Sequence, residues 1–424
     1  MIKLNNSVIK NAVVYLGGGS LVGLISYILM PVLSRYLSPA DYGLVYMFGV
    51  LNMFFVSSIG LQSDTYFTKH YFEYEKPVLA EHVGAILKVI VFSMLFVLSA
   101  VLIFNKQLAA ALSISGNLIT LAVIIGTLTF IGVFILRYYQ LEGKALKYVY
   151  ISLAVAVINI TVSLFLVVYL RLGWKGRIIG ISIPILIQAL ISIIVLNKNG
   201  LIKFGFDLKH VKSVVFFGLP LVLGSLGGWV VNLADKVFIT KMVSISATGI
   251  YGIGSSMGMI MGIIVDSCAR AWVPYFFKNI RDNSPETNIK IVKITYLYSV
   301  VVIAMSFAVT FLSYIFIRYF LAVEYRTSFD YVIWISLGQG IAGIRSIFIY
   351  YLIYKNKNYV LSAIIISTSI LNIALNYFLI RSFGTMGAAY TVFLTSLAAT
   401  VLTIGFGAKY HKMPWLFFLQ PKTP

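Results

Sequence analysis

The sequence predicts an all-α polytopic membrane protein, with 12 transmembrane helices in two six-helix bundles around a central cavity. Hydrophobic residues make up 60% of the 424 residues and charged residues only 11%, and the mean hydropathy is +0.94. Water-soluble chains carry about 25% charged residues. In hydrocarbon every backbone N–H and C=O must be paired within its own segment, which a helix achieves. The apolar runs are also too long for barrel strands of about 9–11 residues.

A transmembrane helix needs about 20 mostly apolar residues, and twelve stretches of the chain meet that requirement. In the first half they are 12–34, 43–62, 83–104, 118–136, 148–170 and 178–196. In the second half they are 213–234, 249–267, 292–317, 331–353, 359–380 and 387–408. The first stretch is predicted to be a retained span, because a cleavable signal has a shorter apolar core and a small-residue cleavage site.

Local signals support several of these helices. Ser38, Pro39 and Asp41 form a helix start, with an N-cap, a first-turn proline and an acid at the third position. Pro184 and Pro220 are expected to interrupt helical hydrogen bonding in or near the sixth and seventh spans.

The two halves of the sequence repeat one plan. The motif KALKY at 144–148 and its counterpart KNKNY at 355–359 are offset by 211 residues, as are the glycine pairs that follow them. Gly43 and Gly249, which open a helix in each half, are offset by 206. Because six is even, both halves enter the membrane in the same direction, as in parallel repeats of transporters.

This repeat predicts three parts. Residues 1–197 form an N-terminal six-helix bundle, 198–212 a basic cytoplasmic linker, and 213–424 a C-terminal six-helix bundle. Two bundles flanking a cavity suit alternating access.

The distribution of Lys and Arg predicts that both termini are cytoplasmic. That side of the membrane collects 21 of the 33 basic residues, against 10 on the opposite side, with Lys88 and Arg345 left inside spans. The net charge of +20 is spread over membrane-edge loops, which favours contact with anionic lipid headgroups over nucleic acid.

Metal and disulfide chemistry is not expected. The single Cys268 permits no internal disulfide, and no metal-ligand cluster is present. The four histidines are predicted to be scattered over loops and helix ends without a metal role: His70, His82, His210 and His411. No cofactor is predicted.

Charges inside the membrane are the candidate functional residues, because each costs about 2.5–3.5 kcal/mol at a span centre. Arg345, deep in the tenth span, is the clearest case. The substrate-binding candidates of the cationic cavity are Arg345, Lys236, Arg270, Lys88, Lys69 and Arg35. The coupling-ion candidates are Asp235, Asp64 and Asp266.

Structural roles compete with these assignments. Asp266 and Arg270 are four residues apart on a helix and are expected to pair. Asp235 and Lys236 are expected to point to different faces without satisfying one another. Lys88 can simply reach toward the cytoplasm, and Arg35 at a helix end can contact headgroups.

Short motifs in matching order give the chain a family resemblance. They include PVLSRYLSPADYG at 31–43, GLPL at 218–221, Asp235-Lys236 and GIY at 249–251. On these motifs the chain resembles the Wzx-type oligosaccharide-lipid flippases of the multidrug/oligosaccharidyl-lipid/polysaccharide exporter superfamily.

The resemblance implies movement of an undecaprenyl-pyrophosphate-linked oligosaccharide, such as an O-antigen unit, from the cytoplasmic to the periplasmic leaflet of a bacterial inner membrane. Cations near the cytoplasmic face would capture the pyrophosphate and those near the outer face would receive it. H⁺ or Na⁺ is a possible coupling ion, and polysaccharide assembly enzymes are possible partners.

Other functions stay open on the sequence alone. A peptidoglycan lipid II flippase fits the charge pattern, whereas a drug or cation antiporter of the same superfamily would favour buried acids. A membrane glycosyltransferase or polysaccharide polymerase would need a larger outer loop or more acids in early outer loops. No nucleotide-binding loop is present, and the chain is predicted not to be an enzyme. A scaffold would not explain the cost of Arg345 and Lys88.

Overall fold

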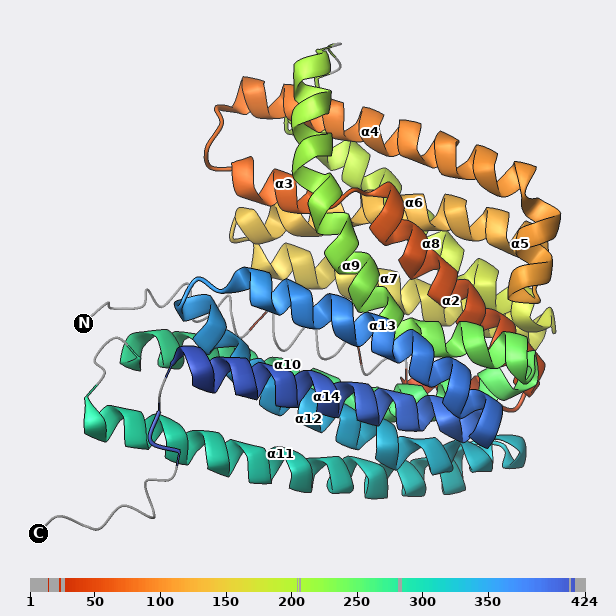
Figure 1. Cartoon of the computed structure of the whole chain (residues 1–424). Helices are drawn as coiled ribbons and strands as arrows, with labels where there is room; N and C mark the ends of the chain where they lie inside the picture. The colour runs from red at the N-terminus through yellow and green to blue at the C-terminus, as the bar shows by residue number, and fades with distance from the viewer. Residues whose placement is uncertain are drawn as a thin grey trace, which may run out of the picture. The chain divides into compact units, whose positions relative to one another are not determined.

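The computed structural model describes residues 14, 23, 27–203, 205, 207–280, 284–411 and 413–415 (Figure 1). Over these ranges the chain is helical, without β-strands, and 11 of its helices are long and apolar enough to cross a membrane. They correspond to the second through twelfth predicted spans, so the all-α polytopic fold is confirmed. Of the first predicted span, 27–33 is helical, and most of the rest lies outside the described residues.

Two compact units make up the chain. The first comprises the residues up to Trp229 together with Ser244–Gly249, and the second comprises Val230–Val243 together with the residues from Ile250 onward. The boundary between these units falls within two helices, after Trp229 in one and after Gly249 in the next. The repeat boundary predicted at residues 198–212 stays a prediction.

The first unit is built around one central helix, α6, which packs against α2 and α8, while α7 packs against α8. Its helices are α2 (Pro39–Ile59), α3 (Ser63–His70), α4 (Lys76–Ile103), α5 (Asn105–Leu112), α6 (Gly116–Leu141), α7 (Ala145–Leu164) and α8 (Gly173–Lys198). A single π-helical turn, η1 (Phe165–Tyr169), extends α7. The predicted start of α2 is confirmed, because Ser38 and Asp41 form a reciprocal capping box. Pro184 lies inside α8, which continues through it.

Helix α9 (Leu208–Met242) begins in the first unit and lies along α2 there. A Cβ added at Gly218 would overlap the carbonyl of Leu61, and the indole Nε1 of Trp229 donates to the carbonyl of Val50 at 2.9 Å. The two glycines related by the repeat, Gly43 and Gly249, meet directly, since a side chain on either would overlap the backbone of the other's helix.

The second unit is organised by α12, which packs against α11 and α14, while α13 packs against α14. Its remaining helices are α10 (Ile245–Asn279), α11 (Pro285–Phe320), the 3₁₀ turn η2 (Val323–Ser328), α12 (Phe329–Tyr354), α13 (Asn358–Phe383) and α14 (Thr385–Tyr410). An aromatic core that includes Trp272, Phe276 and Tyr351 joins α10 to α12.

Three helices are longer than the sequence predicted. Helices α9, α10 and α11 have 35, 35 and 36 residues, or about 52 Å at about 1.5 Å per residue, against a hydrocarbon thickness of about 30 Å. Asp266 and Arg270 therefore lie within α10 and do not close it. Apolarity alone marks the part of a helix that lies in lipid, not the whole helix.

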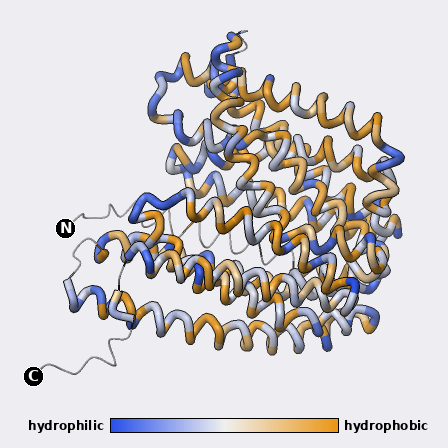
Figure 2. Tube along the Cα trace, viewed as in Figure 1, coloured by the Kyte–Doolittle hydropathy of each residue, from blue (hydrophilic) through white to orange (hydrophobic). Residues whose placement is uncertain are grey.

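Hydrophobic residues predominate along the helices (Figure 2). Many large apolar side chains are exposed, among them Phe96, Val300 and Phe311. Such a surface suits acyl chains, because soluble proteins rarely expose contiguous apolar patches of this extent.

Candidate functional site

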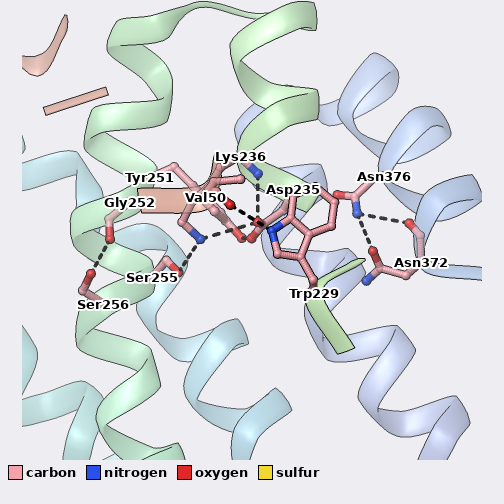
Figure 3. Close-up of polar contacts among 10 residues, drawn as sticks. All are labelled: Val50, Trp229, Asp235, Lys236, Tyr251, Gly252, Ser255, Ser256, Asn372 and Asn376. Carbon is pink, nitrogen blue, oxygen red and sulfur yellow. Dashed lines mark hydrogen bonds and ion pairs between the residues drawn. The ribbon is translucent and has the colours of Figure 1, made fainter. Parts of the chain in front are cut away.

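Asp235 and Lys236 form a buried ion pair in the second unit (Figure 3). Lys236 Nζ lies 3.5 Å from Asp235 Oδ1 and 3.4 Å from Ser255 Oγ. The Tyr251 hydroxyl donates to Asp235 Oδ2 at 2.6 Å, and the Lys236 backbone N–H donates to Oδ1 at 2.8 Å. Both charged residues are only 4% exposed.

The prediction that Asp235 and Lys236 do not satisfy one another is therefore wrong. Adjacent helical residues point in different directions, but the long lysine side chain folds back across the ring of Tyr251, at 5.6 Å from its centroid. The pair is neutral and fully engaged. It fastens the last part of α9 to α10, and neither residue presents an uncompensated charge.

Arg345 lies deep in α12. Gly338 is seven residues earlier and so lies on nearly the same face of the helix, and a side chain there would meet Val392 and Phe393 of α14. Arg345 thus lies on the side of α12 that faces α14. Its Nε is buried without a hydrogen-bond partner, and no carboxylate of the described residues forms an ion pair with it.

Asp64, a second coupling-ion candidate, is neutralised in the first unit. Its Oδ2 accepts from Nη2 and Nε of Arg137 at 3.2 and 3.3 Å, and the aspartate is 8% exposed. This contact joins α3 to α6. The third candidate, Asp266, is exposed.

The expected pair between Asp266 and Arg270 is not formed, so that prediction is also wrong. Both side chains are exposed on α10, and neither has an ion-pair partner among the described residues. Spacing permits an i,i+4 contact, but long exposed side chains gain little from it in a polar environment.

The remaining cationic candidates lie in the first unit and are not gathered together there. Lys88 donates to the carbonyl of Gly205, which precedes α9. Lys69 is exposed, with Nζ 5.4 Å from the ring centroid of Phe217, and Arg35 is exposed after the helical residues 27–33. Lys88 thus reaches the segment predicted as the basic linker.

Arg177 is a half-buried cation that lies just outside the predicted span 178–196. It lies one turn into α8, and its Nη1 donates to Asn159 Oδ1 and Ser163 Oγ of α7, each at 2.6 Å. Ser163 also donates to Asn159 at 3.2 Å. The signal for this cluster was Asn159 itself, a polar residue within an apolar span that repeats near Asn372.

Three histidines that were predicted to be scattered are gathered in the first unit. The rings of His82 and His210 are 4.2 Å apart, and Tyr74 stacks on both His70 and His82. The Tyr66 hydroxyl lies 2.9 Å from His82 Nδ1, and burial raises the pKa of Tyr66 to about 12, so it stays protonated. No group of three or more potential ligands in the described part of the chain is placed to hold a metal ion.

Comparison with known families identifies the chain. The profile of a family described as "Polysaccharide biosynthesis protein" matches residues 8–280. The chain belongs to this family. The match extends from before the first predicted span to the end of α10, and it confirms the resemblance inferred from the short motifs.

Two relatives of this polysaccharide biosynthesis protein come from Haemophilus influenzae. "Lsg locus putative protein 1" is 24% identical over 281 residues, or 65% of this chain and 67% of the relative. An "uncharacterized membrane protein" is 22% identical over 288 residues, or 66% and 67%.

Solved structures show the same fold. The structure titled "Lipid II flippase MurJ, inward closed conformation" matches with a TM-score of 0.73 at 14% identity, covering 94% of this chain and 87% of that one. An inward-facing multidrug resistance MATE family transporter of the MOP superfamily matches with a TM-score of 0.69 at 12% identity, covering 91% and 94%. The chain is therefore a multi-pass membrane protein whose fold matches that of these two structures.

Proposed function

We propose that this protein is a flippase for an undecaprenyl-pyrophosphate-linked oligosaccharide. It moves its substrate from the cytoplasmic to the outer leaflet of a bacterial inner membrane by alternating access, with both termini cytoplasmic and a cationic cavity that binds the pyrophosphate-sugar head. Family membership and the transporter fold support the class of activity.

The observation that carries the proposal is Arg345. A guanidinium within a membrane helix costs several kcal/mol, and no described carboxylate offsets that cost. Its planar fork of donors matches the oxygens of a phosphate. A pyrophosphate diester carries about two negative charges and needs such a group to enter the membrane interior.

The structure narrows the candidate residues within this proposal. Lys236 is held by Asp235, so we assign it to positioning α9 on α10 and not to substrate contact. Lys69, Lys88, Arg35 and Arg270 stay proposed contacts. Because Asp64 and Asp235 are already ion-paired, we propose that any coupling to H⁺ or Na⁺ uses Asp266.

The test is a flipping assay in proteoliposomes with a fluorescent undecaprenyl-pyrophosphate oligosaccharide, scored by exposure of the label to an external quencher. Arg345→Gln should slow flipping at least tenfold at unchanged protein level, and Arg345→Lys should retain part of the rate. Arg381→Gln is the control, because Arg381 is an exposed arginine in the last turn of α13. Undiminished flipping by Arg345→Gln would refute the proposal.

Two further arms separate the remaining possibilities. Labelled lipid II in the same vesicles distinguishes a peptidoglycan precursor from other lipid-linked sugars. Imposed proton and sodium gradients test coupling, and Asp266→Asn should abolish any gradient dependence while leaving passive exchange. A rate that ignores both gradients would remove Asp266 from the mechanism.

A further inference from the structure

Arg177 forms a polar cluster inside the first unit that the proposed function has not used. Its Nη1 is shared between Asn159 and Ser163, which are one turn apart on α7. The helices approach closely there, since a Cβ added at Gly180 would overlap Ser163. The phenols of Tyr42 and Tyr46 on α2 lie close enough to interact electrostatically with the guanidinium. The cluster thus joins α7 to α8 on a part of α8 that also lies near α2.

No described carboxylate compensates the charge of Arg177. Its partners are an amide and a hydroxyl, and none of the described carboxylates forms an ion pair with it. Asp41 lies at the neighbouring end of α2, near Gly173, but its Oδ2 is held by the backbone and side chain of Ser38. The other guanidinium nitrogens, Nε and Nη2, make no hydrogen bond to a described residue.

The second unit contains a comparable amide cluster without the charge. Asn372 and Asn376 of α13 lie two residues beyond the positions that an offset of 211 gives to Asn159 and Ser163. Asn376 donates to Asn372 at 2.9 Å, and Asn372 donates to Thr395 of α14 at 3.4 Å. The repeat offset of 211 places Ala388, which is fully buried, at the position of Arg177. A neutral amide cluster is therefore sufficient to join these two helices, and the arginine is an addition with another purpose.

We propose that Arg177, with Asn159 and Ser163, forms an anion-binding site for a phosphate group inside the first unit. Nη1 is fixed by its two acceptors, which orients the planar guanidinium and leaves Nε and Nη2 to donate to phosphate oxygens in a two-bond arrangement. A bound anion would offset the desolvation of a charge that is otherwise expensive in the membrane. The phosphate comes either from the lipid-linked substrate or from an anionic phospholipid headgroup, and the proposed function supplies only the first of these sources.

The most direct test adds a negative charge at a hydrogen-bond partner of Arg177, so that the guanidinium is neutralised within the protein. Asn159→Asp keeps the shape of the cluster and places a carboxylate at the atom that now lies 2.6 Å from Nη1. It should fold at least as well as the wild type but lose anion binding. The matched control Asn372→Asp puts a carboxylate in the second unit, where no arginine faces it, and should lower the thermal midpoint.

Binding is measured as the shift of the thermal unfolding midpoint in lipid nanodiscs. Inorganic pyrophosphate is titrated in phosphatidylcholine nanodiscs, and phosphatidylglycerol nanodiscs are compared without pyrophosphate. A wild-type response to pyrophosphate identifies the substrate's phosphate as the source, and a response to phosphatidylglycerol alone identifies a headgroup. Arg177→Gln and Asn159→Asp should need at least tenfold more pyrophosphate for the same shift, or should lose the shift in phosphatidylglycerol nanodiscs if the headgroup is the source. Lys175→Gln, which changes an exposed cation on the same turn, should retain the wild-type response.

Equal responses in the wild type and both cluster variants, or no wild-type response to either probe, would overturn the site. This outcome is separate from the fate of the proposed function. If the wild type and Arg177→Gln flip lipid-linked oligosaccharide equally and neither binds an anion at this cluster, the proposed function stands and the site is refuted. If the wild type binds pyrophosphate at Arg177 but flips no substrate, the site stands and the proposed function is refuted.

Discussion

Breaking the buried Asp235–Lys236 pair should destabilise the protein more than removing both charges together. Loss of one partner of a buried ion pair typically costs about 3–5 kcal/mol, because the other charge is left uncompensated. Both residues are 4% exposed, so water cannot readily replace the lost partner. Asp235→Asn and Lys236→Gln are the smallest changes that remove each charge.

The structure predicts that the two single variants differ. After Lys236→Gln, Asp235 keeps the hydroxyl of Tyr251 at 2.6 Å and a backbone N–H at 2.8 Å. After Asp235→Asn, the ammonium of Lys236 loses its counter-charge and keeps neutral contacts, namely Ser255 at 3.4 Å, the face of the Tyr251 ring and the amide oxygen that replaces the carboxylate. We therefore expect Lys236→Gln near about 3 kcal/mol and Asp235→Asn near about 5 kcal/mol.

The measurement is a double-mutant cycle on the free energy of unfolding in mild detergent. The double variant should be at least about 2 kcal/mol more stable than the sum of the single variants predicts, because it leaves no orphaned charge. In the proposed flipping assay the rate should track the folded fraction, since we assign the pair to positioning α9 and not to substrate contact. Additive single effects, or loss of flipping in a fully folded double variant, would refute this reading.

Two further predictions concern packing and pH. Gly43→Ala should lower the stability by about 1–3 kcal/mol, because the added methyl would overpack against Ile245. At the control position Gly49 nothing lies within 4 Å of an added Cβ, so Gly49→Ala should be neutral or stabilising by up to about 1 kcal/mol. Equal effects of the two variants on the thermal midpoint would contradict the close contact at Gly43. Burial holds the pKa of His411 below its ordinary value of 6.5, so the unfolded chain takes up a proton first and stability falls as the pH drops below about 6.5. Between about pH 7.5 and 5.5 the thermal unfolding midpoint should therefore decrease less for His411→Gln than for the wild type. Equal decreases in the two proteins would exclude His411 as the cause.

Features set by local composition were predictable from the sequence. Each apolar stretch of about 20 residues must satisfy its own backbone in lipid, so the positions of the spans follow from hydropathy alone. The start of α2 was equally local, because Ser38 and Asp41 lie within one turn of each other. The full lengths of α10 and α11 were not predictable from hydropathy, because a helix can continue past the membrane edge through charged residues.

The pairing of charges was not predictable, because it depends on contacts distant in the sequence. Asp64 and Arg137 are 73 residues apart. Arg177 of α8 donates to Asn159 of the neighbouring helix α7, 18 residues earlier. The Asp235–Lys236 contact is adjacent in sequence, yet it depends on Tyr251 and Ser255 of the next helix. Helical periodicity gives the direction of a Cβ but not the course of a four-carbon side chain around an aromatic ring.

The way in which charges pair also bears on the kind of cargo. A cation antiporter needs a carboxylate that is available to exchange a cargo cation for a coupling ion, and two of the three candidate acids, Asp64 and Asp235, are held by Arg137 and Lys236. Arg345 and Arg177, in contrast, have no carboxylate partner among the described residues. Apart from the exposed Asp266, the unpaired charges among these candidates in the described helices are therefore positive. Because an uncompensated cation in the membrane is stabilised only by a ligand of opposite sign, this balance favours an anionic head group over a cationic drug as the cargo.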